Sequence, residues 1–416
     1  MIDKLIKLDL VTKEMEFKCA TDLISAFSGK DSQSYQPFFE RSKTNKIVDI
    51  KIYAVGNNNT NAQFSSKWDV WKQTNIILKL IMADGCEALS GVISYNTGDF
   101  SEVCLLELKS FHLELYNLET FDPIEVGMLL RKIKPKLSDL SRSSIDIALW
   151  DLAAKRADIS LATMLGKKRD SIKSYASLPC YKSLSDYSDA VNKYGELGHK
   201  IFKFHVWGNL RKDMALIEMI NDEFKESSYH FMVDLESTYT FKDAITLGQL
   251  MDEDLFIFME APIDDYLLDN YSKIRDLLTI PIVPDGFEFY SSDFIQQGIA
   301  KRSWDACKFD ATIVGGITEA IKLLIIANNA NLPVEFQSWG HSLVQLANLH
   351  LTLANKRSQY FEIPMPRELY DFGMKDVILL KDNEIHAPLG SGMGIEVNWS
   401  ELATADYFKK FSMGVR

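Results

Sequence analysis

The chain has 416 residues, and 46% of them are hydrophobic, which is enough to build a large folded core. Its 46 basic and 58 acidic side chains give a formal net charge of −12 without a basic stripe, so we expect no nucleic-acid partner. The five cysteines are scattered, with neither zinc-ligand spacing nor a disulfide framework. No leader-like segment opens the chain, and no apolar run is long enough to cross a bilayer. We therefore expect a cytoplasmic protein with no membrane partner.

The first part of the chain predicts a mixture of strands and helices. Residues 1–46 mix charged and apolar side chains without a strong period. Residues 47–55 alternate as a half-buried strand does, and the turn-rich segment 56–61 follows them. A second strand is expected over residues 75–82, and residues 102–140 predict mostly helix. We expect this part to fold as an α+β unit.

The clearest helix is expected over residues 144–165. Its apolar side chains follow the i, i+3, i+4, i+7, i+8 stripe of one buried helix face: Ile145, Ala148, Leu149, Leu152 and Ala153. Ser143 and Ser144 are candidate N-caps, and Gly166 stands where a helix C-cap would.

From about residue 172 onward, short apolar runs alternate with helical stretches. After a first run near residues 174–176, the runs are 200–206, 231–234, 255–260, 280–285, 304–310, 333–336 and 360–362. Their spacing of about 20–30 residues suits one strand, one helix and two short loops. Such alternation predicts a parallel sheet, and eight units favour a closed (β/α)₈ barrel of the TIM type over an open doubly wound sheet.

Acidic side chains end three successive strands of this predicted barrel. All strands of a parallel barrel point the same way, so Asp234, Glu260 and Asp285 would meet at the carboxyl-terminal rim, where barrel active sites lie. Three carboxylates repel one another unless a cation lies between them, and an all-oxygen ligand set suits Mg²⁺. The alternative is that these charges only mark where strands meet solvent.

Candidate acid–base groups end other strands of the predicted barrel. Asp310 and His341 end the sixth and seventh units, so a hydrogen bond from histidine Nδ1 to the carboxylate would leave Nε2 free to exchange a proton. Lys203 and His205 lie two residues apart on one strand and share its face. Lys203 could hold a substrate carboxylate, and His205 could be a second acid or base. In the alternative interpretation, both histidines are structural.

Several segments occur in an order and spacing that resemble one known family. They are residues 145–152, 232–234, 259–262, 310–318, 340–342, 348–351, 361–362 and 388–394. Together they are similar to the enolase superfamily, specifically its mandelate racemase/muconate lactonizing enzyme branch, over about residues 47–398.

The resemblance implies a set of metal ligands. Asp234, Glu260 and Asp285 would bind one Mg²⁺ per subunit, with Glu288 as a rival for the third position because relatives differ by a residue there.

The resemblance also implies roles for the other strand ends. Lys203 matches the first lysine of a Lys-x-Lys motif, and Glu362 matches the electrophilic glutamate of the eighth strand. Asp310 and His341 match the aspartate–histidine dyad.

Two residues depart from the family pattern. His205 replaces the second lysine of the motif, and Glu236 stands where relatives usually carry an asparagine. Both put in doubt the face from which a proton is removed. Glu236 is also a candidate to add charge to the metal site or to contact a substrate hydroxyl.

The resemblance predicts a modified, enolase-like barrel with a capping domain. We expect an N-terminal extension over residues 1–46 packed with the cap, an α+β capping domain over 47–142, the barrel over 143–370, and a segment over 371–416 that returns to the cap. The loop at residues 56–66 is our candidate for closing over the barrel and selecting the substrate.

The predicted chemistry is removal of the proton alpha to a carboxylate. The resemblance favours Mg²⁺-dependent dehydration of a sugar acid, an aldonate or aldarate, to a 2-keto-3-deoxy acid by a homo-oligomeric enzyme. One alternative is a racemase or epimerase that uses the same intermediate, because proton return on the opposite face would give that product. A second alternative is a binding descendant without turnover.

Overall fold

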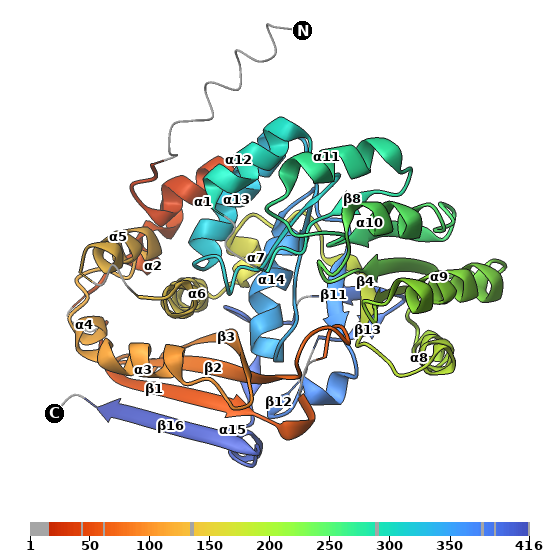
Figure 1. Ribbon diagram of the computed structural model, residues 1–416. Coiled ribbons are helices and arrows are strands. Elements are labelled where there is room, and N and C mark those ends of the chain that lie inside the picture. Colours follow the sequence, from red (N-terminus) through yellow and green to blue (C-terminus); the bar gives the residue numbers. More distant parts are fainter. Residues whose placement is uncertain are drawn as a thin grey trace, which may run out of the picture.

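The computed structural model describes residues 16–42, 45–60, 63–133, 137–287, 291–375, 378–386 and 388–414. An antiparallel sheet lies on one side of the molecule, strands surrounded by helices lie on the other, and a long helix separates them (Figure 1). Among the described residues, we find no helix that combines the length and apolarity needed to cross a membrane.

The antiparallel sheet has four strands in the order β16-β1-β2-β3. They are β1 (Ile47–Gly56), β2 (Trp71–Met82), β3 (Glu87–Thr97) and β16 (Tyr407–Gly414). The structure confirms both predicted strands of this region, although β2 begins earlier than expected. The sequence did not predict β3, because its residues 88–93 are all buried and lack the alternation of a half-exposed strand.

Three helices follow the sheet within the stretch predicted as helical. They are α3 (Val103–Ser110), α4 (His112–Tyr116) and α5 (Pro123–Ile133).

The long helix α6 (Asp139–Arg156) packs on β2 and β3, between the sheet and the barrel strands (Figure 1). The predicted helix over residues 144–165 is correct in its middle and wrong at its start, since the N-cap is Ser138. Ser143 and Ser144 lie inside the helix and are buried. The Ser143 Oγ accepts a hydrogen bond from the Gly315 N–H. The chain turns after α6 into the short α7 (Leu161–Met164), and Gly166 follows with a φ of 83°.

All eight predicted barrel strands are present. They are β4 (Ser171–Leu178), β5 (Ile201–His205), β6 (His230–Asp234), β7 (Phe256–Glu260), β8 (Ile282–Val283), β9 (Cys307–Phe309), β10 (Val334–Phe336) and β11 (Phe361–Pro364). The helices between them are α8 (Leu184–Glu196), α9 (Leu210–Phe224), α10 (Phe241–Gly248), α11 (Leu268–Leu277), α12 (Ser292–Lys301), α13 (Ile317–Asn329) and α14 (Ser342–Ala354).

These strands are parallel and form the predicted barrel. A continuous ladder joins them in the order β11-β4-β5-β6-β7-β8, and β9 pairs with β10. The Asp305 N–H donates to the Ile282 carbonyl at 2.9 Å and links the two groups.

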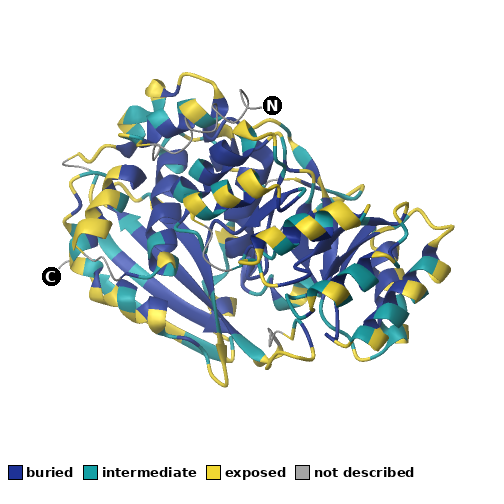
Figure 2. Cartoon of the chain, turned by 45° about the horizontal axis from the view of Figure 1, so that its top comes forward, coloured by how far each residue is buried: buried dark blue, intermediate teal, exposed yellow. Residues whose placement is uncertain are grey.

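The lower barrel interior is apolar. Six buried side chains form their own cluster, which we call the apolar floor: Tyr175, Ile201, Met232, Phe258, Val283 and Ala306. Figure 2 shows that buried residues fill the strands and the central helices, whereas exposed residues lie on outer helix faces and loops. The floor closes the barrel from below, so any reaction site must lie above it.

Both ends of the described chain pack on the sheet and the barrel. Helix α1 (Ala20–Ser28) lies against α13, and α2 (Gln36–Phe39) lies against α6, with the rings of Phe39 and Trp150 edge to face at 5.5 Å. At the other end, β16 pairs with β1 along its whole length.

His350 of α14 makes the fold sensitive to acid. Its Nε2–H donates to the Met393 carbonyl at 3.3 Å, and its Nδ1 accepts from the Ala162 N–H at 3.2 Å. Burial lowers the pKa of His350 from 6.5 to about 4. Between pH 6.5 and about 4, His350 is therefore protonated in the unfolded chain but neutral in the folded chain. The free energy of unfolding falls as the pH falls through this window.

We expect His350→Gln to reduce this acid sensitivity by roughly 1.4 kcal/mol per pH unit within the window. Urea unfolding at several pH values between 7 and 4.5 measures it. The same slope in both proteins would contradict the assignment of the neutral histidine.

Candidate active site

A layer of charged side chains lies one step above the apolar floor. Side chains on one face of a strand repeat every two residues, so each floor residue is followed two positions later by another interior residue. The pairs are Ile201 and Lys203, Met232 and Asp234, Phe258 and Glu260, Val283 and Asp285, and Ala306 and Lys308. The predicted convergence of these side chains at the carboxyl ends of the strands is thus a property of the strand register.

Lys203 stands at the centre of the charged layer and is only 1% exposed. Its Nζ lies 3.0 Å from Asp234 Oδ2, 3.1 Å from Glu260 Oε1 and 2.8 Å from Glu362 Oε1. Burial alone would lower the pKa of Lys203, but the three carboxylates raise it well above its usual value, so it stays charged. A single ammonium group therefore holds together carboxylates from three strands.

Lys308 is a second interior lysine that the sequence analysis missed. Its Nζ contacts Glu260 Oε1, and both side chains are fully buried. Burial alone would raise the pKa of Glu362, but Lys203 and Lys308 lower it to about 2. The signal was present in the sequence, because Lys308 lies two residues before Asp310 on the same strand face.

Asp285 follows β8 beside the charged layer. Its N–H donates to Asp265 Oδ1 at 3.1 Å. Burial, together with the negative charges of Asp265 and Asp234, raises the pKa of Asp285 to about 8. Among the described residues, the donor atoms that lie within 4.8 Å of one another belong to His205, Asp234 and Glu236, and this set does not include Asp285. The rival ligand Glu288 lies outside the described residues.

His205 points its unprotonated nitrogen at the acidic cluster. Its Nδ1–H donates to the Leu178 carbonyl at 2.6 Å, which leaves Nε2 as the acceptor of a neutral ring. Nε2 lies 3.3 Å from Glu236 Oε1 and 3.5 Å from Asp234 Oδ2. Burial lowers the pKa of His205 to about 4. A neutral imidazole in a fixed tautomer has the form that a general base needs.

Glu236 is held beside His205 by an unusual backbone. Its φ is 51°, in the left-handed region that non-glycine residues rarely adopt, and its N–H donates to Asp234 Oδ1 at 3.0 Å. Strain of this kind persists where the surrounding structure fixes it, and it concentrates at functional sites.

Asp310 lies across the barrel from His205, since β9 and β5 are four strands apart in the ring of eight. Its Oδ1 accepts hydrogen bonds from the Thr312 N–H at 2.7 Å and from Asn348 Nδ2 at 2.8 Å. Burial raises the pKa of Asp310 to about 6.

The structure corrects the predicted dyad of Asp310 and His341. Strand β10 ends at Phe336, so Gln337 follows the strand and His341 lies further on, at the N-cap of α14. His341 Nε2–H donates to the Phe372 carbonyl at 2.7 Å, and Nδ1 accepts from the Leu343 N–H at 3.5 Å. Both ring nitrogens are thus used away from Asp310, and the tautomer is opposite to the predicted one.

We expect His341→Asn to lower stability by about 1 kcal/mol, because the ring loses its bond to the Phe372 carbonyl. The turnover rate should change by less than about threefold, because the expected role of His341 is structural. Thermal unfolding and turnover of the same preparation measure both. A large loss of turnover with unchanged stability would restore His341 to the mechanism.

A loop between β1 and β2 covers this site, in the region where the sequence predicted a closing loop. Trp68 Nε1–H donates to the Glu236 carbonyl at 3.3 Å, and the Gln63 carbonyl accepts from the Cys180 N–H at 3.4 Å. The Phe64 ring lies 5.8 Å from the His205 ring and 5.2 Å from that of Trp339. The loop therefore brings an aromatic side chain from the sheet onto the barrel site.

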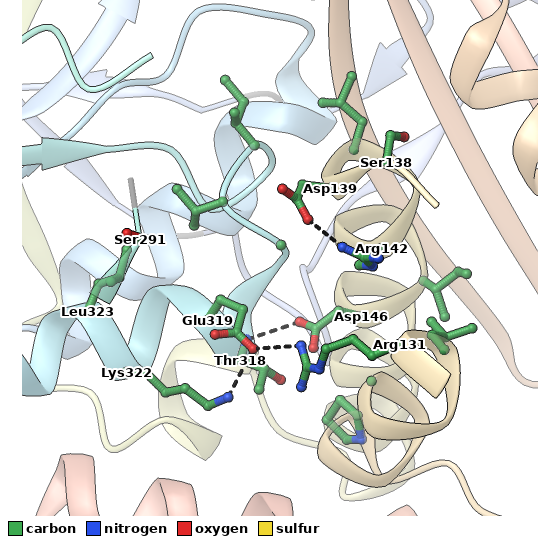
Figure 3. A pocket seen from close by; sticks show the side chains of 18 of the residues that line it. Arg131, Ser138, Asp139, Arg142, Asp146, Ser291, Thr318, Glu319, Lys322 and Leu323 are labelled. Carbon is green, nitrogen blue, oxygen red and sulfur yellow. Dashed lines mark hydrogen bonds and ion pairs between the residues drawn. The ribbon is translucent and has the colours of Figure 1, made fainter. Parts of the chain in front are cut away.

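A cavity of about 1300 Å³ lies between α5, α6 and α13 and extends to Tyr95 and Phe287. Figure 3 shows that its charged side chains point at one another. Glu319 pairs with Arg131 at 3.2 Å and with Lys322 at 2.9 Å, and Arg142 pairs with Asp139 at 2.9 Å. Because these charges are engaged in ion pairs with one another, the strand ends remain the candidate active site.

Two family matches cover most of the chain. Residues 49–166 match the mandelate racemase/muconate lactonizing enzyme N-terminal domain, and residues 186–401 match the enolase C-terminal domain-like family. The chain belongs to the mandelate racemase/muconate lactonizing enzyme branch of the enolase superfamily.

Relatives within this superfamily include sugar-acid dehydratases. The chain is 26% identical to arabinonate dehydratase of Saccharolobus solfataricus over 61% of this chain and 69% of that protein. It is 29% identical to L-talarate/galactarate dehydratase of Salmonella typhimurium over 51% of this chain and 55% of that protein. A solved mandelate racemase/muconate lactonizing enzyme homologue from Pseudovibrio sp. has a TM-score of 0.85 and 28% identity, covering 90% of this chain and 100% of that one. The enolase-superfamily fold, with a capping domain and a barrel, is thereby confirmed.

The donor set of the site suits a divalent cation. The carboxyl groups of Asp234, Glu260 and Asp285 offer only oxygen ligands, as Mg²⁺ prefers. Among the described residues, the charged layer contains two lysines, Lys203 and Lys308, and a larger number of acids: Asp234, Glu236, Glu260, Asp285, Asp310 and Glu362. His205 could add a nitrogen ligand, since one donor atom each of His205, Asp234 and Glu236 lies within 4.8 Å of the others.

Proposed function

We propose that this protein removes the proton alpha to a carboxylate of a hydroxylated acid and dehydrates it to a 2-keto acid, as a Mg²⁺-dependent sugar-acid dehydratase. The observation that supports this most is the buried Lys203, which is surrounded by carboxylates at the strand ends, while Nε2 of His205 points at Asp234 and Glu236 of the same cluster. Sugar-acid dehydratases among the relatives make an aldonate or aldarate the first choice of substrate.

In this proposal, different residues would bind the metal, stabilise the negative charge and remove the proton. Asp234, Glu260 and Asp285 would hold the metal, with Glu288 as the alternative third ligand, and the metal would supply positive charge to the substrate carboxylate. Lys203 would add a second positive charge where the carboxylate gains electrons, and the ionised Glu362 would hold Lys203 in place through their ion pair. His205 would take the alpha proton through Nε2.

The leaving hydroxyl needs a proton from the other side. Asp310 faces His205 across the barrel, and its pKa of about 6 lets a fraction of the carboxyl groups carry a proton near neutral pH. In this proposal Asp310 gives the proton that the sequence analysis had assigned to His341. An epimerase remains the second candidate, because the same Asp310 could instead return a proton to the alpha carbon.

Exchange of the alpha proton in D₂O tests the proposal. A panel of aldonates and aldarates is incubated with the protein and Mg²⁺, with a chelated sample as control, and exchange is followed together with 2-keto acid formation. Exchange with keto-acid formation supports a dehydratase, and exchange with an inverted centre supports an epimerase. Absence of exchange from every acid would support a binding protein and contradict both.

A further inference from the structure

An aromatic wall stands beside His205, whose ring lies 5.8 Å from the Phe64 ring and 5.2 Å from the Trp339 ring of this wall. It consists of Tyr370, Trp339, Phe64, Tyr95 and Phe287, in which each ring lies 5.2–5.7 Å from the next. The wall combines the cap, through Phe64 and Tyr95, with barrel loops, through the other three rings. It therefore forms only when the cap sits on the barrel.

Apart from the hydroxyls of Tyr95 and Tyr370, this wall offers only ring surface to a polar ligand. Phe64 and Phe287 have none, and the single donor of Trp339 is used, since its Nε1–H lies 3.1 Å from both Glu362 Oε1 and Ser177 Oγ. The Tyr95 hydroxyl lies 3.4 Å from Gln73 Nε2. A substrate group against this wall gains by packing its C–H surface, whereas a charged group there would lose its hydration without a partner.

The charges around the wall also disfavour a second negative group. Lys203 and Lys308 are already surrounded by the carboxylates of the charged layer. Lys67, the nearest cation of the covering loop, donates to the Thr238 carbonyl at 2.6 Å and lies 5.1 Å from the centre of the Tyr239 ring. The second carboxylate of a dicarboxylic acid would therefore lie against acidic side chains and aromatic rings.

We propose that the substrate is a monocarboxylic acid whose remote end is apolar, and that Phe64 selects it by packing against that end. This rests on the proposed function and narrows it, because it favours aldonates and their deoxy forms over aldarates. It makes Phe64 a specificity residue supplied by the cap.

The test uses sets of three acids with the same backbone configuration. Their remote ends are a methyl group, a hydroxymethyl group or a second carboxylate. For wild-type protein with Mg²⁺, we expect kcat/KM for alpha-proton exchange to be at least about tenfold higher for the methyl acid than for the dicarboxylate. Phe64→Arg should reverse this order by pairing with the second carboxylate, and Phe64→Leu should keep it. Lys67→Met is the matched control and should leave the ratio unchanged.

Binding separates this inference from the proposed function. Calorimetric dissociation constants for the same acids report selectivity without turnover. If no acid exchanges but the methyl acid binds more tightly than the dicarboxylate, the dehydratase proposal fails and the selectivity stands. If the dicarboxylate binds or reacts as well as the methyl acid, or if Lys67→Met alone abolishes its binding, the selectivity proposal is overturned. Thermal unfolding of each Phe64 variant shows that it is folded.

Discussion

Replacing His205 by asparagine is expected to slow alpha-proton exchange by about 10²–10⁴-fold, the usual contribution of a positioned general base. The imidazole is buried, neutral and fixed in one tautomer by the Leu178 carbonyl, so its Nε2 is the available basic nitrogen on this side of the barrel. Initial rates in D₂O with the best acid of the panel measure the effect. His341→Asn is the matched control, because it removes another buried histidine whose nitrogens bond elsewhere.

An unchanged rate in His205→Asn, with normal Mg²⁺ binding, would remove His205 as the base. A loss of metal binding in the same variant would instead assign His205 to the ligand set with Asp234 and Glu236.

The second large effect is expected from Lys203→Met. The change leaves Asp234, Glu260 and Glu362 buried without their common counter-charge, and loss of one partner of a buried ion pair costs about 3–5 kcal/mol. Exchange should also slow by at least about 10³-fold, because the developing negative charge loses a fixed cation. Urea unfolding and D₂O exchange measure the two effects.

A matched control is Lys79→Met. Lys79 is also a mostly buried lysine, paired with Glu87 at 2.6 Å, but it lies in the cap sheet. It should lose some stability and keep its exchange rate. Added Mg²⁺ should raise the unfolding midpoint of Lys203→Met more than that of wild type, because the metal would replace the missing charge. Equal midpoint shifts would argue that the metal binds away from Lys203.

The barrel strands could be predicted from the sequence because their signal is local. Runs such as 231–234 and 255–260 are apolar, short and ended by an acid, which is what a buried parallel strand requires. Strand β3 escaped prediction because burial on both faces removes the alternation, while Ser90 and Gly91 interrupt the continuous apolar run that such a strand would otherwise show.

The sequence predicted those residues of the candidate site whose positions follow from strand register. The positions of Lys203, Asp234 and Glu260 follow from the two-residue repeat of each strand. His341 was assigned to the end of the seventh strand although the predicted run 333–336 and β10 both stop at Phe336, and His341 lies five residues further on, at the N-cap of α14. Phe64 could not be found in this way, because its contacts join the cap to loops far away in the chain.

The pairing of β16 with β1 constrains how the molecule is made. Asp49 faces Gly414 and Gly56 faces Tyr407, so this sheet cannot be completed until nearly all of the chain has left the ribosome. Contacts between such distant residues form late and slowly, because a long loop must close first. The barrel can collapse earlier on its neighbouring strands, and β1 can pair early with β2, whereas the second edge of β1 stays open until β16 arrives. The cap sheet would thus gain its fourth strand as the last step of maturation.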